Sequence, residues 1–301
     1  MVLLNLGCGS HYISSDEWIN IDLSSSSEYV KSYNLLKGIP LDSESVDIVY
    51  HSHIIEHFSK DDALFFMKEC YRVLKHGGII RVATPDFALI ANEYLNNLKK
   101  VLENENEINK ANYEWIIIEL IDQLTRNQPG GEMLKYWKQD KIVNEKYIEE
   151  RVGYEFKNWR ENYIESKKRE NFIESKKDES SKLEIKKSFF NSCKRRIKII
   201  ISNLMIFLKS IKRKLLNTTF KKDQDYHYTS LGKFRLSGEI HQWMYDTYSL
   251  KKLLEEAGFS EITKVDAHTS AIPNWGNYKD LDIRNEKPRK PDSMFFEAKK
   301  I

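Results

Sequence analysis

A short apolar run that stops at two glycines constrains the fold of this chain more than any other feature. Residues 2–6 read Val-Leu-Leu-Asn-Leu, and Gly7-Cys8-Gly9 follows at once. The run predicts a buried strand, and the glycines predict a tight turn whose backbone amides lie open to a ligand. A second run, Trp18–Asp22, ends on an acid. Two strands that end in this way favour a sheet with a binding site at its carboxyl edge.

Further along the chain, apolar runs alternate with a helical pattern. Residues 46–50 and 79–83 predict two more strands. Residues 61–74 lie between them, carry apolar side chains at three- and four-residue steps and begin with acids, so they predict an amphipathic helix. A strand, a helix and a strand in this order predict an α/β fold, with a Rossmann-like parallel sheet and helices on both of its faces.

The C-terminal residues continue this pattern. Ser249 is predicted to cap a helix over residues 250–257, and strands are predicted at 261–268 and 293–298. The α/β core is therefore predicted to consist of two stretches of the chain, residues 1–95 and 238–301.

The residues between these stretches have a different pattern. Residues 96–164 are mostly helical by periodicity and are predicted to form an insertion that caps the site. Residues 165–237 are predicted to hold a charged linker followed by a basic amphipathic helix. The linker, residues 165–187, is rich in Lys, Glu and Ser and has few apolar positions, which is typical of a solvated segment.

The basic helix dominates the charge of the chain. Residues 186–222 hold twelve Lys and Arg and no acid, which leaves −9 on the rest of a chain whose formal charge is +3. Its apolar side chains recur at helical steps: Ile197, Ile200, Ile201, Leu204, Leu208, Ile211 and Leu215. A helix of this kind is too short to span a bilayer but suits an anionic membrane surface. The alternative is a helix packed on the insertion. The acidic body disfavours nucleic acid as a partner, and no oligomeric state is predicted.

Cysteine content and hydropathy indicate the compartment. The three cysteines, Cys8, Cys70 and Cys193, are far apart and form no Cys-x-x-Cys pair, so a disulfide framework is not expected. No apolar run reaches the roughly 18–20 residues that span a bilayer. We therefore expect a cytoplasmic protein, with the basic helix as a peripheral contact at the inner face of the membrane.

The glycine turn and the acid after it indicate a nucleoside ligand. The carboxylate of Asp22 is expected where it can accept both ribose hydroxyls. The dinucleotide fingerprint G-x-G-x-x-G is incomplete because position 12 is Tyr, and the chain between Gly9 and Trp18 is too short for a full helix to hold a pyrophosphate. These features argue against NAD or FAD and favour a nucleoside without phosphates.

Several motifs carry a resemblance to a known family. They are Asn5-Leu6-Gly7-Cys8-Gly9, Trp18-Ile19-Asn20-Ile21-Asp22-Leu23, Ser52-His53-Ile54-Ile55-Glu56-His57, Gly238-Glu239-Ile240-His241-Gln242-Trp243-Met244-Tyr245-Asp246 and Lys290-Pro291-Asp292-Ser293. Together they resemble the class I S-adenosylmethionine-dependent methyltransferases, and within them a bacterial subgroup often associated with surface-polysaccharide synthesis. The resemblance implies S-adenosyl-L-methionine as cofactor and O-methylation of a saccharide or saccharide-linked acceptor in cell-surface glycan synthesis.

The resemblance also assigns cofactor residues. Gly7 and Gly9 would face the methionine part of the cofactor, and Asp22 would bind the ribose hydroxyls. Asn34 falls where the family usually has an Asp facing the adenine amino group. Asn5 stands where an acid often supports the cofactor's amino group. In the matched motif, His53 and His57 would lie on the cofactor side, and the Glu56-His57 pair would close the cofactor pocket.

His241 is the candidate general base for a hydroxyl acceptor, because histidine is the best base near neutral pH. Glu239 or Asp246 would orient its imidazole. Alternatively, His241 only bonds a backbone carbonyl among core aromatics. The spacing His51-x-His53-x3-His57 also fits zinc, but no metal site is predicted from it.

The insertion is implied to line the acceptor side. Arg126 would clamp a carboxylate or phosphate of the acceptor, or would pair with an acid of the body. Trp243 and Tyr245 would contact the acceptor. The faces of Trp243, Trp275 and Tyr278 suit pyranose rings, although core packing explains these aromatics equally well.

Two other functions remain open. One is an NAD-type Rossmann oxidoreductase, which the missing third glycine disfavours. The other is a noncatalytic adaptor that keeps the fold while the basic helix recruits a membrane.

The membrane contact is testable by liposome flotation. The full chain is expected to float with anionic vesicles, because the Lys and Arg of residues 186–222 are attracted to the headgroups while the apolar face inserts. A chain lacking residues 186–222 is the control and should stay at the bottom of the gradient. Equal flotation of the two chains, or none of either, would contradict the membrane contact.

Overall fold

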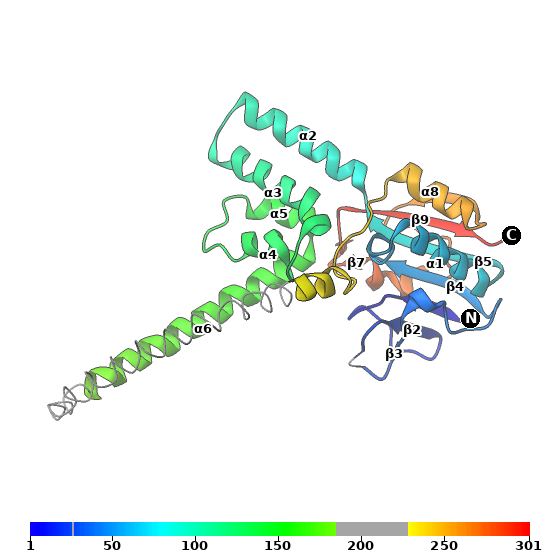
Figure 1. The fold of residues 1–301 in the computed structure, drawn as a ribbon, viewed down its shortest axis with the longest axis horizontal. Coiled ribbons are helices and arrows are strands. Elements are labelled where there is room, and N and C mark those ends of the chain that lie inside the picture. The colour runs from blue at the N-terminus through cyan, green and yellow to red at the C-terminus, as the bar shows by residue number, and fades with distance from the viewer. Residues whose placement is uncertain (26, 185–227) are drawn as a thin grey trace, which may run out of the picture. The chain divides into compact units, whose positions relative to one another are not determined.

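A seven-stranded sheet forms the centre of the molecule (Figure 1). The structure, a computed structural model, describes residues 1–25, 27–184 and 228–301. The strand order is β3-β2-β1-β4-β5-β9-β6. The strands are β1 (Leu3–Leu6), β2 (Trp18–Asp22), β3 (Val30–Ser32), β4 (Val46–Ser52), β5 (Leu74–Pro85), β6 (Ser260–Val265) and β9 (Ser293–Lys299).

Five neighbouring strands, β3 to β5 in the sheet order, pair in parallel, while β9 pairs antiparallel with both β5 and β6. The predicted α/β fold with a mostly parallel sheet is confirmed. Strand β5 is longer than the predicted residues 79–83, since it begins directly after helix α1 (Lys60–Val73) and includes Gly77 and Gly78.

Alternate residues of the strands serve two different cores. Leu4, Leu6 and Val49 belong to a core shared with the buried faces of α1 and helix α8 (Thr247–Glu256), which lie beside the sheet in Figure 1. Leu3 and Tyr50 point the other way. On that face they pack against the segment 272–281, which contains the short helices η4 (Trp275–Asn277) and η5 (Lys279–Leu281).

The second core explains two aromatics that the sequence left open. Trp275 and Tyr278 are buried against Trp18 and Tyr50, so they are core side chains and are not exposed for sugar stacking. Arg81 lies beneath Trp275, where its guanidinium pairs with Asp282 and Glu297 at 2.7 Å each. This fully buried ion pair network fixes the 266–289 segment to the sheet.

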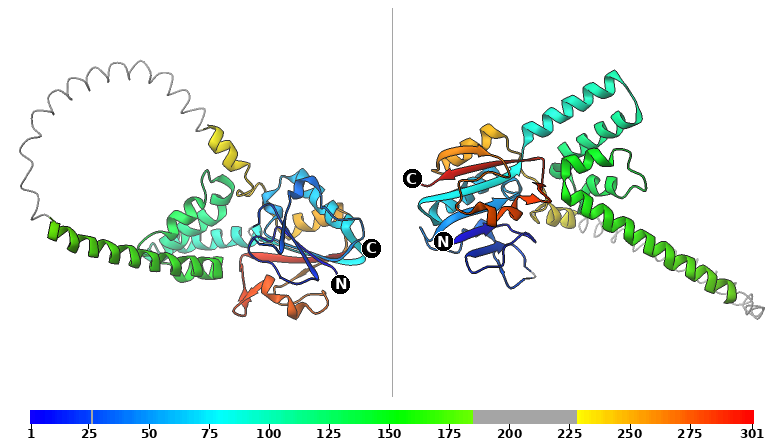
Figure 2. Two further views of the ribbon diagram at one scale, coloured as in Figure 1. Left: turned by 90° about the horizontal axis from the view of Figure 1, so that it is seen from below. Right: turned by 180° about the vertical axis from the view of Figure 1, so that it is seen from behind.

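The helices after β5 extend the same compact unit (Figure 2). They are α2 (Phe87–Glu103), α3 (Glu107–Thr125), α4 (Gly131–Trp137) and α5 (Glu145–Val152). Residues 1–158 and 238–301 form one unit and residues 159–237 a second. The C-terminal segment of the first unit begins at Gly238, and residues 96–158 of the predicted insertion fall in that unit with the core.

Two predicted elements differ from the structure. Helix α6 (Tyr154–Glu184) runs through residues 165–184, which were predicted to be a linker, because Lys and Glu are strong helix formers even without apolar partners. Helix α8 begins before the predicted residue 250, since Asp246 caps it and Ser249 completes a capping box at its third position.

The predicted basic helix of residues 186–222 lies outside the described residues. Among the helices that are described, none is long and apolar enough to cross a bilayer. The described structure also contains a short antiparallel pair, β7 (Ile283–Arg284) and β8 (Lys287–Pro288), two short helices, η1 (Leu35–Lys37) and η2 (Ile55–His57), and a helical stretch at residues 228–235.

The turn after β1 requires its glycines for different reasons. Gly7 (φ +61°) and Gly9 (φ +52°) both adopt left-handed backbone conformations. A Cβ on Gly7 would meet Ile54 Cδ1 at 2.4 Å, whereas a Cβ on Gly9 would meet nothing within 4 Å. Gly7 therefore permits close packing of the turn after β1 against the turn after β4, and Gly9 leaves its surface open.

This difference predicts unequal effects of alanine. Both Gly7→Ala and Gly9→Ala carry the left-handed strain of about 1–2 kcal/mol. Gly7→Ala must also displace Ile54, at a further cost of about 1–3 kcal/mol. The free energy of unfolding measured in urea should therefore be highest for the wild type, lower for Gly9→Ala and lowest for Gly7→Ala. Equal stability of the two variants would contradict the close packing.

His51 predicts a pH dependence of stability. Its side chain is fully buried, both ring nitrogens lack hydrogen-bond partners, and burial lowers its pKa from 6.5 to about 4. The unfolded chain therefore binds the proton more tightly, so stability is lost as the pH falls from 6.5 to about 4. The loss amounts to about 3 kcal/mol at 1.36 kcal/mol per pKa unit. Urea unfolding across this range should show a smaller loss in His51→Leu. The exposed His76→Leu is the control and should keep the wild-type slope.

Candidate functional site

The first part of the site lies at the carboxyl ends of β1 and β2. Asp22 accepts hydrogen bonds from Gly9 N at 2.9 Å and from Ser24 N at 3.1 Å, one on each carboxylate oxygen. Gly9 and Asp22 line an open cavity of about 840 Å³, whose walls include Tyr12 and Tyr29. The structure thus brings the predicted glycine and the predicted acid together at one cavity of a size that suits a nucleoside ligand.

The two asparagines at predicted cofactor positions have local partners. Asn5 is buried and donates to His11 O at 3.0 Å and to Asn20 Oδ1 at 3.2 Å, which ties β1 to the loop before β2. Asn34 accepts from Leu36 N at 3.0 Å and so caps η1. Both side chains therefore have structural roles at the edge of this region.

The second part of the site joins two segments far apart in the sequence. The carbonyl of Glu56, in η2, accepts hydrogen bonds from Gln242 N at 2.7 Å and Trp243 N at 3.2 Å. The neighbouring His57 has its Nδ1 3.1 Å from the carbonyl of Ile240. The segment 240–243 is thereby held along η2. His241 N donates to Gln123 O at 2.9 Å, which also links this segment to α3.

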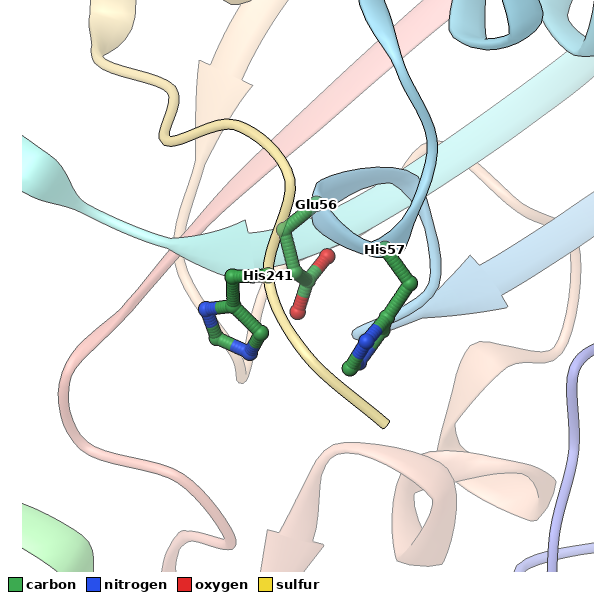
Figure 3. A group of neighbouring side chains, drawn as sticks. All are labelled: Glu56, His57 and His241. Atoms are coloured by element: carbon green, nitrogen blue, oxygen red, sulfur yellow. The ribbon is translucent and has the colours of Figure 1, made fainter. Parts of the chain in front are cut away.

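Three side chains meet at this junction: Glu56, His57 and His241 (Figure 3). The rings of His57 and His241 are 4.8 Å apart and nearly perpendicular. His53 lies beside them, with Nδ1 3.2 Å from Glu56 Oε1 and Nε2 2.7 Å from Ser293 Oγ. Its left-handed backbone (φ +55°) is held by a hydrogen bond from its N–H to Ala83 O.

The charge states at the junction follow from burial. Glu56 is fully buried, which would raise its pKa, but the contact with His53 and the other imidazoles hold that pKa well below its usual range. Burial lowers the pKa of His53 to about 4 and that of His241 to about 3. The junction therefore holds a buried carboxylate beside two imidazoles, those of His53 and His241, whose charged forms burial disfavours.

The acids predicted to orient His241 are engaged elsewhere. Asp246 caps α8 through Ser249 N at 2.8 Å. Glu239 accepts from Gly130 N at 3.0 Å and lies 3.7 Å from Arg126. The carboxylate with the largest effect on the pKa of His241 is instead that of Glu56, which raises it against the effect of burial.

The predicted acceptor residues differ in exposure. Arg126 is paired with Asp122 at 2.8 Å, so its charge is already compensated by the body. Tyr245 is buried in the first core, and its carbonyl accepts from Phe87 N. Trp243 is 40% exposed, with Lys60 Nζ 4.1 Å from its ring centre. Of the three, Trp243 is the most available to a ligand.

Sequence reasoning placed Glu56 only with His57 at the closing of the cofactor pocket, and it assigned no role to Ser293 or Lys290. Glu56 and Ser293 contact the imidazoles directly, and the charge of Lys290 acts on His53 and His241. The signal was present, since all three residues lie within the motifs that carry the family resemblance. Their meeting place depends on the fold, which brings residues about 185 and 240 positions apart into contact.

Comparison with known proteins agrees with the first part of the site. A family described as "Hypothetical methyltransferase" matches residues 1–133. A protein of Mycolicibacterium smegmatis, described as "Probable S-adenosylmethionine-dependent methyltransferase", is 43% identical over 51 residues. That match covers 17% of this chain and 19% of the relative, so the chain matches about a fifth of the relative's length.

Two solved structures are also similar. A SAM dependent methyltransferase of Aquifex aeolicus is 18% identical, with 29% of this chain and 57% of that chain covered at a TM-score of 0.25. One of Archaeoglobus fulgidus is 21% identical, with coverages of 34% and 58% and a TM-score of 0.24. Both sequence matches are to proteins described as methyltransferases, and the relative of Mycolicibacterium smegmatis is described as S-adenosylmethionine-dependent. In its N-terminal part the chain is thus similar to the S-adenosylmethionine-dependent methyltransferases.

Proposed function

We propose that the protein transfers a methyl group from S-adenosylmethionine to an acceptor, and that the acceptor is a hydroxyl of a saccharide or saccharide-linked molecule in cell-surface glycan synthesis. The observation that supports the cofactor most directly is the pairing of Asp22 with the Gly9 amide at the mouth of the cavity. Each carboxylate oxygen of Asp22 keeps a second lone pair for a ribose hydroxyl.

The geometry disfavours the alternative of an NAD-type oxidoreductase. Residues 7–17, all of which the structure describes, contain no helix between β1 and β2. A dinucleotide site of the Rossmann type seats its pyrophosphate on the N-terminus of the helix that follows the first strand. This chain offers glycines and an acid without that helix, which suits a nucleoside lacking phosphates.

The acceptor side is proposed from the second part of the site. Ile54 packs against Gly7, and Glu56 follows two residues later, so the junction of imidazoles begins beside the cofactor turn. A neutral imidazole at His241 can take up the proton of an acceptor hydroxyl, and Glu56 would stabilise the imidazolium. Burial weakens this base, and the carboxylate offsets part of that effect. The exposed Trp243 offers a face to a sugar ring.

Cofactor binding is tested at Asp22. Asp22→Asn is expected to weaken the binding of S-adenosylmethionine at least about tenfold, because hydrogen bonds to a charged group contribute about 1.5–3 kcal/mol. Calorimetric titration measures this change, with Asp16→Asn, an exposed residue of the loop before β2, as the matched control. Tight binding of NAD without binding of S-adenosylmethionine would overturn the proposal.

Turnover is tested at His241. His241→Ala is expected to keep S-adenosylmethionine binding and to lose methyl transfer, because the imidazole lies at the junction and not at the cavity of Asp22. The assay uses labelled S-adenosylmethionine with an extract of the organism's own glycans. Unchanged turnover would remove His241 from the reaction. If the wild type binds S-adenosylmethionine but methylates no fraction of the glycan extract, the noncatalytic adaptor would be favoured.

A further inference from the structure

The junction of Glu56, His57 and His241 has the composition of a metal site. Each side chain offers one ligand atom, and the three atoms all lie within 4.8 Å of one another. Two imidazoles and a carboxylate are a donor set that zinc and other divalent transition metals use at sites with open positions. Magnesium and calcium, which prefer all-oxygen surroundings, fit this set poorly.

Two of the donor residues hold atoms without partners. Glu56 is fully buried and His241 is 4% exposed. Glu56 Oε1 and His241 Nδ1 nevertheless have no hydrogen-bond partner, although His53 Nδ1 lies 3.2 Å from that oxygen without hydrogen-bond geometry. An unsatisfied buried polar atom costs about 1–3 kcal/mol, and more if it is charged. A cation bound by the carboxylate would offset this cost at Glu56.

Hydrogen bonds from neighbouring groups orient the donor side chains, as they do at protein metal sites. His57 Nδ1 is 3.1 Å from Ile240 O, which fixes the tautomer with a proton on Nδ1 and leaves the Nε2 lone pair for an ion. Thr84 Oγ1 donates to Glu56 Oε2 at 3.1 Å and orients the carboxylate. Such contacts behind the ligands are a regular feature of protein metal sites.

The spacing of the ligand atoms is also compatible with a bound ion. Zinc bonds of about 2.0–2.1 Å place tetrahedral ligand atoms about 3.4 Å apart. Ligand atoms as far apart as 4.8 Å therefore need to close by about 1.4 Å around an ion, which rotations about the side-chain bonds supply.

We propose that Glu56, His57 and His241 bind one divalent transition metal ion, with at least one coordination position open to an oxygen ligand. The open position would face the acceptor. The role of the ion therefore rests on the proposed methyl transfer, whereas the binding of the ion does not. Because a ligand imidazole cannot also take up a proton, an ion bound here would exclude the base role proposed above for His241, and the titration below decides between the two roles.

The experiment titrates the untagged full chain, stripped with a chelator, with Zn²⁺, with Fe²⁺ under anaerobic conditions and with Mg²⁺. One Zn²⁺ or Fe²⁺ per chain is expected to bind, and the tighter of the two identifies the preferred ion. Mg²⁺ is expected not to bind. Co²⁺ should give the visible spectrum of a site with nitrogen and oxygen ligands. The absence of saturable binding at one ion per chain would overturn the proposal.

Substitutions test whether these three side chains bind the ion. His57→Ala, His241→Ala and the isosteric Glu56→Gln should each weaken binding at least about tenfold, since even residues behind the ligands affect affinity by about 10–100-fold. His268→Ala, a change at an exposed histidine away from the junction, is the control and should bind as the wild type does. Wild-type affinity in all three variants would overturn the proposal.

Two measurements keep this outcome separate from folding and from methyl transfer. Circular dichroism checks each variant, and if His241→Ala does not fold, the half-buried His57→Ala decides. S-adenosylmethionine is titrated into the stripped wild type. Metal binding without cofactor binding would refute the proposed function alone, and cofactor binding without metal binding would refute the metal site alone.

Discussion

The buried carboxylate of Glu56 is the group on which the arrangement of the site depends. Moving a carboxylate out of water costs several kcal/mol unless nearby groups compensate it. Here the compensation comes from Thr84 on β5, from His53 after β4 and from imidazoles on either side. The backbone carbonyl of the same residue accepts Gln242 N and Trp243 N. The C-terminal segment is therefore held at η2 by the residue that also sets the charge of the junction.

Local patterns in the sequence were sufficient for the parallel strands and for the edge of the sheet where Gly9 and Asp22 meet. The apolar run before Gly7 and the acid at the end of β2 act through neighbours close in the chain, and parallel strands bring their ends together without further information. The partner of His241 could not be found in this way. Glu239 and Asp246 are close to it in sequence, but a loop amide and a helix N-terminus offered them better hydrogen bonds. The carboxylate that acts on His241 lies 185 positions away, so only the fold identifies it.

The predicted linker shows a different limit of sequence reasoning. Residues 165–184 lack an apolar stripe, and helix prediction by periodicity depends on such a stripe. A helix can also form from Lys and Glu at helical spacing, as the pair Glu165–Arg169 illustrates at 2.5 Å. Composition therefore distinguishes a solvated segment from a core segment, but it does not distinguish a solvated helix from a coil.

The turn after β1 and the imidazole junction are connected through the packing of Ile54 on Gly7. Because Gly7 has no Cβ, Ile54 can pack directly on the turn after β1, and the backbone from Ile54 continues into η2 with Glu56 and His57. A ligand that orders the glycine turn would therefore restrict η2 as well, and with it the segment 240–243 that η2 holds. The insertion contributes from the other side, since Gln123 O accepts His241 N. The arrangement of the junction is thus set by three stretches of chain: η2, the segment 240–243 and the insertion.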